Sequence, residues 1–192
     1  KINSSKVVSR LKLEENGYFV VSAHREENID LNNNFKVLVA SLNAVAEKYQ
    51  KPIIFSTHPR TKNRIIKDKI TFHPLIKNIS PLGFFDYVKL QQSSFVVLSD
   101  SGTISEESAM MGFPAVSIRT STERPEAIDA GTIVLGGINT DQILNSIEII
   151  RDMSKYNITD LPWEYNVINS SERVVKVIQS YTSIVNKVIW NK

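Results

Sequence analysis

The chain has 192 residues, of which 42% are hydrophobic and 22% are charged, and its formal net charge is +3. This composition is typical of a globular domain with a buried core, and the basic residues form no block of the kind that binds nucleic acid. The chain contains no cysteine, which excludes disulfides and thiolate chemistry. No apolar run approaches the roughly 20 residues that span a bilayer, and no signal peptide is visible, so we expect a cytoplasmic protein without nucleic-acid or membrane partners.

Short runs rich in β-branched and aromatic residues alternate with stretches that have the 3.6-residue spacing of amphipathic helices. In chain order we expect a strand at 18–23, a helix at 31–50, a strand at 52–57, a helix at 62–69, a strand at 76–79, a helix at 84–92, a strand at 95–98, a helix at 104–111, a strand at 114–118, a helix at 125–130, a strand at 132–135 and a helix at 140–153. This alternation predicts an α/β fold, in which helices cover both faces of a doubly wound, Rossmann-like parallel sheet.

The C-terminal part has a different pattern. Residues 160–163 contain a proline and read as a break, and no strand follows them. The spacing of apolar residues then predicts one long helix at 171–190.

Four polar clusters come directly after expected strands. They lie at 24–28, 58–60, 100–103 and 120–126. Doubly wound sheets bind ligands in the crevice beyond the carboxyl ends of their strands, so we expect all four clusters to face one crevice.

The sequence Ser101-Gly102-Thr103 lies between an expected strand and an expected helix. Free N–H groups and the positive end of the helix dipole would make this turn an anion site suited to phosphate, although a simple N-cap role for either hydroxyl explains it equally well. Glu106 and Glu107 follow one turn later and point about 100° apart, so only one of them can face the crevice. A carboxylate there suits the hydroxyl groups of a ribose, and dipole-favoured surface glutamates are the alternative.

Two of the three histidines, His24 and His58, follow strands and have an arginine nearby, Arg25 and Arg60. A histidine in such a place acts as a general acid or base, or binds phosphate. We interpret the third, His73, as structural. The spacing of the histidines does not organise a zinc site, so we expect no metal.

Arg124 stands before Pro125, which fits the first turn of a helix. We read Arg124 as a second phosphate ligand, and a surface salt bridge with Glu123 or Glu126 is the alternative. Together the clusters describe a pocket for a diphosphate that carries a ribose, as in a nucleotide or a nucleotide-sugar.

The segments SAHREEN, STHPRT, LSDSGTISEESAMMGFPAVSIRTSTERPEA and AGTIVLGG resemble the C-terminal half of the non-hydrolysing UDP-N-acetylglucosamine 2-epimerases. The segment SSERVVKVIQSYTSIVNKVIWNK is similar to the C-terminal segment of those family members that make UDP-N-acetyl-L-fucosamine-type sugars for capsule or O-antigen. The resemblance implies a two-domain enzyme of the glycosyltransferase-B type. Residues 1–160 would be its UDP-binding domain and 161–192 a helical extension, and the N-terminal domain would be absent from this chain.

The resemblance also implies roles for individual residues. The family often has Gly-Gly where this chain has Gly102-Thr103, a departure that leaves the backbone N–H groups in place. His24 would be the catalytic histidine, and Tyr87 would lie against the uracil. The diphosphate would be bound by Ser101, Gly102, Thr103 and Arg124, and the ribose by Glu107. Arg25 and His58 would contact a second, allosteric nucleotide-sugar.

The family reaction inverts C2 by anti elimination of UDP to a 2-acetamidoglycal, followed by re-addition of UDP, and it needs no cofactor. Because the family's acid and base carboxylates belong to the N-terminal domain, we expect this chain alone to bind UDP weakly and not to epimerise. For the full-length protein the resemblance implies a homodimer. A UDP-sugar glycosyltransferase and a non-catalytic nucleotide-sugar-binding module remain alternatives.

Overall fold

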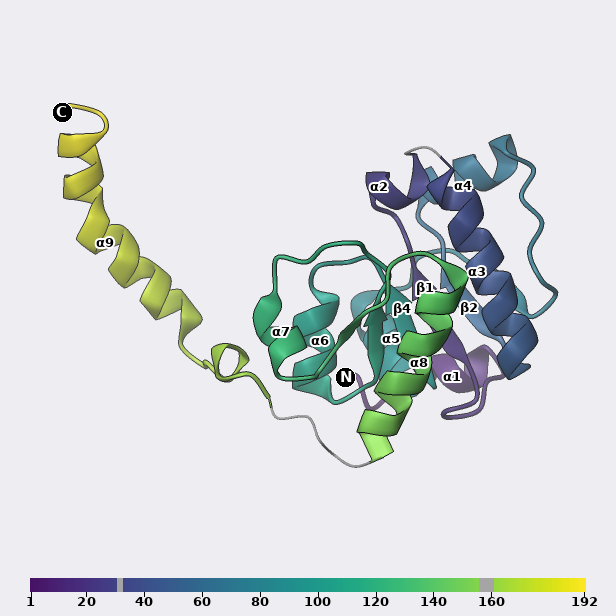
Figure 1. Cartoon of the computed structure of the whole chain (residues 1–192). Helices are drawn as coiled ribbons and strands as arrows, with labels where there is room; N and C mark the ends of the chain where they lie inside the picture. The colour runs from purple at the N-terminus through teal and green to yellow at the C-terminus, as the bar shows by residue number, and fades with distance from the viewer. Residues whose placement is uncertain (31–32, 156–160) are drawn as a thin grey trace. The chain divides into compact units, whose positions relative to one another are not determined.

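The structure is a computed structural model that describes residues 1–30, 33–155 and 161–192. The chain divides into two compact units, Lys1–Pro162 and Trp163–Lys192 (Figure 1). In chain order the elements are α1 (Val7–Arg10), β1 (Phe19–Ser22), α2 (Glu26–Ile29), α3 (Asn34–Tyr49), β2 (Ile53–Ser56), α4 (Pro59–Lys67), β3 (Ile76–Ile79), α5 (Phe84–Gln92), β4 (Val96–Ser99), α6 (Ile104–Met111), β5 (Ala115–Ser117), α7 (Pro125–Asp129), β6 (Val134–Leu135), α8 (Thr140–Lys155), the 3-10 helix η1 (Trp163–Tyr165) and α9 (Ser170–Val188).

The first unit is built on a single parallel sheet with the strand order β3-β2-β1-β4-β5-β6. Val20 of β1 pairs with Ile54 of β2 on one side and with Val97 of β4 on the other. The order runs outward in both directions from the β1/β4 pair, which makes this pair the switch point where such sheets bind ligands. The expected doubly wound α/β fold is confirmed.

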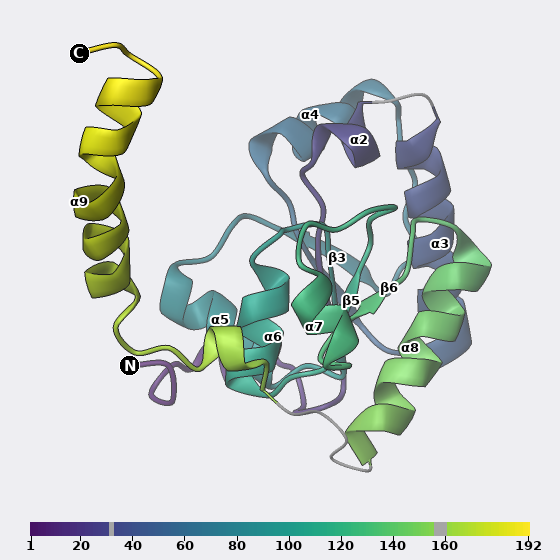
Figure 2. The ribbon, with the colours of Figure 1, turned by 60° about the vertical axis from the view of Figure 1, so that its left-hand side comes forward.

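Alternate residues of each strand point to opposite faces of the sheet, and both faces are buried. Phe19 and Val21 of β1 belong to the core that α3 and α8 close, through residues such as Leu42 and Ile147. Val20 points the other way and is also fully buried. In Figure 2, α3 and α8 lie on one side of the sheet, and α5 and α6 lie on the other. Because helices cover both faces of the sheet, the strand sequences are continuous runs of apolar residues.

The element boundaries differ from the expected ones mainly where a polar residue starts a helix. The helix expected at 62–69 begins earlier, at Pro59, because proline fits the first helical position and the His58 ring accepts a hydrogen bond from the Arg60 N–H. The short helices α1 and α2 were not expected, since four residues carry too little periodicity to be recognised. The helix expected at 31–50 is observed from Asn34, and residues 31–32 of that prediction lie outside the described residues.

The second unit consists of η1 and α9. The helix expected at 171–190 is observed at Ser170–Val188, and none of its side chains is buried. Apolar side chains recur along it at Val174, Ile178, Tyr181 and Val185, a spacing that gathers them into one stripe. Residue 160, at which we expected the first domain to end, lies outside the described residues. Within the described part of the chain, no helix combines the length and the apolarity needed to cross a bilayer.

Candidate functional site

The four polar clusters follow β1, β2, β4 and β5, which are neighbours in the sheet. Contacts between side chains show that they meet at one edge, as expected. The His24 and His58 ring centroids lie 6.3 Å apart, and Arg25 Nη2 lies 3.6 Å from Glu123 Oε1. The carboxyl edge of the sheet therefore brings His24, Arg25 and His58 close to the residues that follow β4 and β5.

Asp100 connects the two strands of the switch point. It follows β4, its side chain is fully buried, and it receives hydrogen bonds from the backbone N–H groups of His24 (3.0 Å to Oδ2) and Arg25 (2.9 Å to Oδ2), which follow β1. Asn28 Nδ2 adds a third donor at 3.1 Å. The imidazole of His24 also lies against this carboxylate, with Nδ1 3.2 Å from Oδ1. Asp100 thus fixes the course of the chain after β1 and the place of the His24 ring.

The turn after β4 leads into α6 without a side-chain cap. Thr103 is the N-cap residue but makes no capping hydrogen bond with its side chain. Its hydroxyl instead donates to Glu107 Oε1 at 3.0 Å, and Ser101 Oγ lies 3.0 Å from Thr103 Oγ1. These hydroxyls therefore do not cap the helix, and the N-cap alternative is wrong. The first N–H groups of α6 keep their positive polarity toward the turn.

Glu106 and Glu107 have different partners, as expected for adjacent helical residues. Glu106 Oε1 accepts a hydrogen bond from Arg124 Nε at 2.5 Å. Glu107 Oε2 accepts one from Gln91 Nε2 at 3.0 Å, and Gln91 is almost fully buried on α5. Glu106 is thus an ion-pair partner of Arg124, whereas Glu107 is held between Gln91 and the start of its own helix.

Arg124 lies against the glycine of the turn. A Cβ atom built on Gly102 would be 2.8 Å from Arg124 Nη1 and 3.2 Å from Glu123 Oε1, so only glycine admits this contact. Glu123 accepts hydrogen bonds from Arg124 Nη1 and Arg119 Nη1, both at 2.9 Å. The bond from Arg119 is the main reason that the pKa of Glu123 is lowered, and the bond to Glu106 raises the pKa of Arg124. The salt-bridge alternative for Arg124 is thus present, with Glu106 as an additional partner, and the guanidinium still lies beside the turn.

A small pocket of about 240 Å³ opens at the same edge. Burial raises the pKa of Tyr87, one of the lining residues, to about 12, although a hydrogen bond with Ser22 acts in the opposite direction. Tyr87 comes from α5, so a residue that only the resemblance had suggested lies beside His24 and His58. The complete lining is Ser22, His24, Ser56, His58, Pro81, Leu82 and Tyr87.

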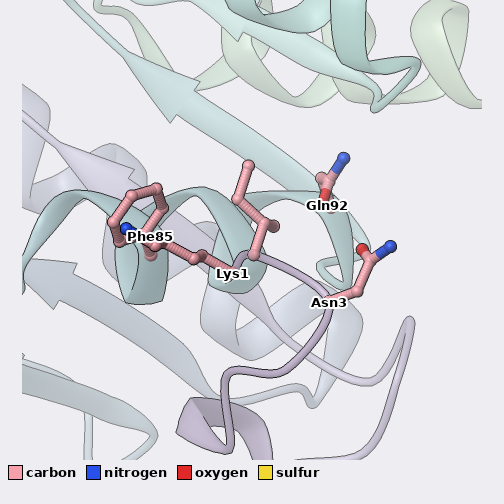
Figure 3. Close-up of a pocket in the computed structure, with 5 residues that line it drawn as sticks. Lys1, Asn3, Phe85 and Gln92 are labelled. Carbon is pink, nitrogen blue, oxygen red and sulfur yellow. The ribbon is translucent and has the colours of Figure 1, made fainter.

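Another pocket lies away from the strand-end residues, between the first residues of the chain and α5 (Figure 3). Lys1, Ile2 and Asn3 line it together with Phe85 and Gln92, and Lys1 Nζ lies 5.5 Å from the centre of the Phe85 ring. None of the residues expected at the functional site takes part in it.

Several residues of the site were not expected. Asp100 was predicted only as a member of its cluster, and the sequence gives no prediction for Gln91 or Arg119. The missed signal at Asp100 and Arg119 is a charged residue directly after an apolar strand, where burial demands partners. His73, which we interpreted as structural, accepts a hydrogen bond from the Leu75 N–H and lies 3.2 Å from Glu47. In the described parts of the chain, no three histidine, aspartate or glutamate side chains are grouped so that they could hold a metal ion.

Comparison with known proteins identifies the family of this chain. A family model described as UDP-N-acetylglucosamine 2-epimerase matches residues 1–179. The UDP-N-acetylglucosamine 2-epimerase of Methanocaldococcus jannaschii is 32% identical over 170 residues, which cover 85% of this chain and 45% of that protein. A protein of the same name from Methanococcus maripaludis is 36% identical over 150 residues, 74% of this chain and 40% of that protein.

Solved structures agree with the sequence matches. The UDP-N-acetylglucosamine 2-epimerase of Rickettsia bellii superposes with a TM-score of 0.82 at 36% identity, over 100% of this chain and 52% of that chain. The M. jannaschii enzyme, solved in complex with UDP-GlcNAc and UDP, superposes with a TM-score of 0.80 at 30% identity, over 93% of this chain and 50% of that chain. The chain therefore spans about half the length of the relatives it matches. It belongs to the UDP-N-acetylglucosamine 2-epimerase family.

Proposed function

We propose that this chain is the UDP-binding half of an enzyme that inverts C2 of a UDP-N-acetylhexosamine by eliminating and re-adding UDP. The observation that carries the proposal is the match of the family model to residues 1–179, which contain every residue of the strand-end site. The remainder of the enzyme, a second domain, belongs to the half of the relatives' length that this chain does not cover.

The start of α6 is the proposed site of the diphosphate. The backbone N–H groups of Gly102 and Thr103 and the dipole of α6 provide positive polarity. The Arg124 guanidinium, which is paired with Glu106 and Glu123, lies against Gly102. A phosphate that displaced Glu123 from Nη1 would meet a planar pair of donors on this arginine, while Nε stays bonded to Glu106. UDP leaves with its negative charge on the diphosphate, so these groups would stabilise the departing group during elimination.

The proposed nucleoside positions flank this diphosphate site. Glu107 can receive ribose hydroxyl groups in place of the Thr103 hydroxyl that it now accepts, and Tyr87 offers a ring for the uracil beside the pocket at His24. His24 would contact the diphosphate or the sugar at the switch point. Arg25 and His58 stand at the same edge and are the residues through which a second, allosteric nucleotide-sugar would act.

The carboxylates of this edge already have partners. Glu106 and Glu123 bind Arg124, Glu107 binds Gln91, and Asp100 is buried. A base for the weakly acidic C2 proton must be free and correctly placed, so we assign it to the half of the enzyme outside this chain. We accordingly expect the chain alone to bind UDP without epimerising UDP-sugars.

The substrate is proposed at two levels. UDP-GlcNAc is the first choice, because the M. jannaschii relative was solved with UDP-GlcNAc and UDP. The 6-deoxy-L-talose analogue, converted to an L-fucosamine product for capsule or O-antigen, is the finer proposal and rests on the resemblance of the C-terminal segment. For the full-length protein we also propose a homodimer, which its molar mass in solution would test.

The test is an incubation of the full-length protein with each UDP-sugar in D2O, followed by NMR. Epimerisation predicts inversion at C2 together with deuterium at that carbon. Transfer of the sugar to an acceptor without deuterium at C2 would instead identify a glycosyltransferase. The 192-residue chain is assayed in parallel, and turnover by it at a rate near that of the full-length protein would contradict the assignment of the base to the other half.

A further inference from the structure

The two oxygens of the Asp100 carboxylate have different neighbours. Oδ2 accepts the shorter hydrogen bonds from the polypeptide, at 3.0 Å from the His24 N–H, 2.9 Å from the Arg25 N–H and 3.1 Å from Asn28 Nδ2. Oδ1 has a longer contact of 3.2 Å with the His24 N–H and lies 3.2 Å from Nδ1 of the His24 ring. Oδ2 therefore anchors the chain, and Oδ1 faces the ring.

The chemistry of this contact determines where the ring carries its proton. A neutral imidazole has one nitrogen that donates and one that accepts. An unprotonated Nδ1 and a carboxylate oxygen are both acceptors, so they would repel each other at 3.2 Å in a site where Asp100 has no exposed surface. A proton on Nδ1 removes this conflict and turns the repulsion into an attraction.

The other two histidines have the opposite arrangement. Nδ1 of His58 accepts a hydrogen bond from the Arg60 N–H at 3.3 Å, and Nδ1 of His73 accepts one from the Leu75 N–H at 3.2 Å. In their neutral forms both must therefore carry the proton on Nε2. All three histidines lie among the described residues, and His24 alone has a carboxylate at Nδ1.

We propose that Asp100 is a positioning residue that holds the His24 ring in the form protonated on Nδ1, so that Nε2 is the nitrogen that meets the ligand. The importance of this for catalysis rests on the proposed function, since His24 is the histidine assigned to the UDP-sugar. With Nδ1 facing Asp100, Nε2 is the nitrogen left to hydrogen-bond with a diphosphate or sugar oxygen, or to gain and lose a proton there. The carboxylate also restricts rotation of the ring, as in other sites where an acid orients a histidine.

A need for two acceptor oxygens explains why an aspartate, rather than an asparagine, suits this position. An asparagine could keep its single oxygen toward Arg25 and Asn28. Its NH2 group would then face Nδ1 of His24 and would require that nitrogen to be unprotonated. Asp100→Asn is therefore expected to move the proton of the neutral ring from Nδ1 to Nε2 while keeping the hydrogen bonds to the Oδ2 position and losing the longer one from the His24 N–H to Oδ1.

The test is a long-range 1H–15N NMR spectrum of the 192-residue chain labelled with 15N-histidine, recorded without ligand at a pH where the imidazoles are neutral. We expect one Nδ1–H ring and two Nε2–H rings in the wild type, with the single Nδ1–H ring lost in a His24→Gln variant used for assignment. In Asp100→Asn the His24 Nδ1 resonance should shift from the protonated to the unprotonated region, while His58 and His73 stay unchanged.

Asn28→Ala is the matched control, because the Asn28 amide donates to Oδ2 of Asp100, the oxygen turned away from the His24 ring, and to the Ile118 carbonyl. It loosens the same cluster but should leave His24 protonated on Nδ1. An Nε2–H ring at His24 in the wild type would overturn the proposal, even if Asp100→Asn does not fold. An unchanged His24 Nδ1 resonance in a folded Asp100→Asn variant would also overturn it. The same shift of that resonance in Asn28→Ala would overturn it as well. Because no UDP is present, a failure here leaves the proposed function untouched, and a failure of UDP binding leaves the proton assignment untouched.

Discussion

Arg124 Nε donates a hydrogen bond to Glu106 Oε1 at 2.5 Å, and this ion pair holds the guanidinium beside Gly102 at the start of α6. The two residues come from elements that follow neighbouring strands, β4 and β5. Their pairing places the guanidinium at the turn whose N–H groups already favour an anion, and the glutamate offsets part of its charge. The proposed phosphate site is therefore assembled from two strand ends rather than from a single motif.

Gly102→Ala should weaken UDP binding by about tenfold, which corresponds to about 1.4 kcal/mol. The added Cβ would meet Arg124 Nη1 at 2.8 Å, and the flexible guanidinium would move away from the turn. The free energy of unfolding should change little, because a side-chain end can shift without displacing the backbone. Gly83→Ala is the control, since its Cβ would have nothing within 4 Å. Calorimetry with UDP that gives equal affinities for both variants would contradict this role of Gly102.

Glu123→Gln should strengthen UDP binding by roughly two- to fivefold, in line with the modest energies of exposed ion pairs. Glu123 is an exposed carboxylate that binds Arg119 and Arg124, so it competes with a phosphate for the same donors. Glu47→Gln removes the same charge near His73 instead and should have no effect on binding. A loss of affinity in Glu123→Gln would show that the carboxylate positions Arg124 rather than competes with the ligand.

Glu107→Gln should separate ribose recognition from phosphate recognition. If Glu107 accepts the ribose hydroxyl groups, its loss should lower UDP affinity by about 1.5–3 kcal/mol, the range of hydrogen bonds to a charged group. Pyrophosphate has no ribose, so its affinity should stay near that of the wild type. Titrations of both ligands decide the point, and a parallel loss for UDP and pyrophosphate would place Glu107 at the phosphates.

Tyr87 should make the fold sensitive to alkali. Its pKa is raised by burial to about 12 from an unfolded value of 10.0, so the unfolded chain loses this proton first. The contribution to stability is complete below pH 10 and disappears as the pH rises toward 12, by about 2 kcal/mol. Denaturant unfolding at several pH values should show less alkaline loss in Tyr87→Phe than in Tyr181→Phe, a control on the exposed face of α9. An equal alkaline loss in the two variants would contradict this assignment.

The sequence predicted the fold because its strands are apolar throughout and its helices have clear periodicity. The strand at 76–79 matches β3 residue for residue, and the alternation of strands and helices predicted that the sheet is parallel. The short helix α2 could not be predicted, because its four residues carry little periodicity and because Asp100, 75 residues further along the chain than Arg25, accepts the N–H groups just before it.

The sequence also predicted where the site lies, but not its hydrogen-bond network. The clusters after the strands were recognisable because the carboxyl ends of parallel strands share one edge. The partners of Arg124, Glu107 and Asp100 were not, since ion pairs and buried hydrogen bonds form between residues that only the folded chain brings together. Gln91 is the plainest example, because a glutamine within a helix carries no sign that it is buried against Glu107.

The central claim is that the carboxyl edge of this sheet binds UDP through Arg124 and the start of α6. Calorimetry of UDP binding to the 192-residue chain, comparing the wild type with Arg124→Ala, tests it most directly, with circular dichroism to verify that both proteins are folded. We predict that the wild type binds UDP and that Arg124→Ala binds it at least about tenfold more weakly, because a charged phosphate ligand is lost. No binding by the wild type, or equal affinity of the two folded proteins, would contradict the account.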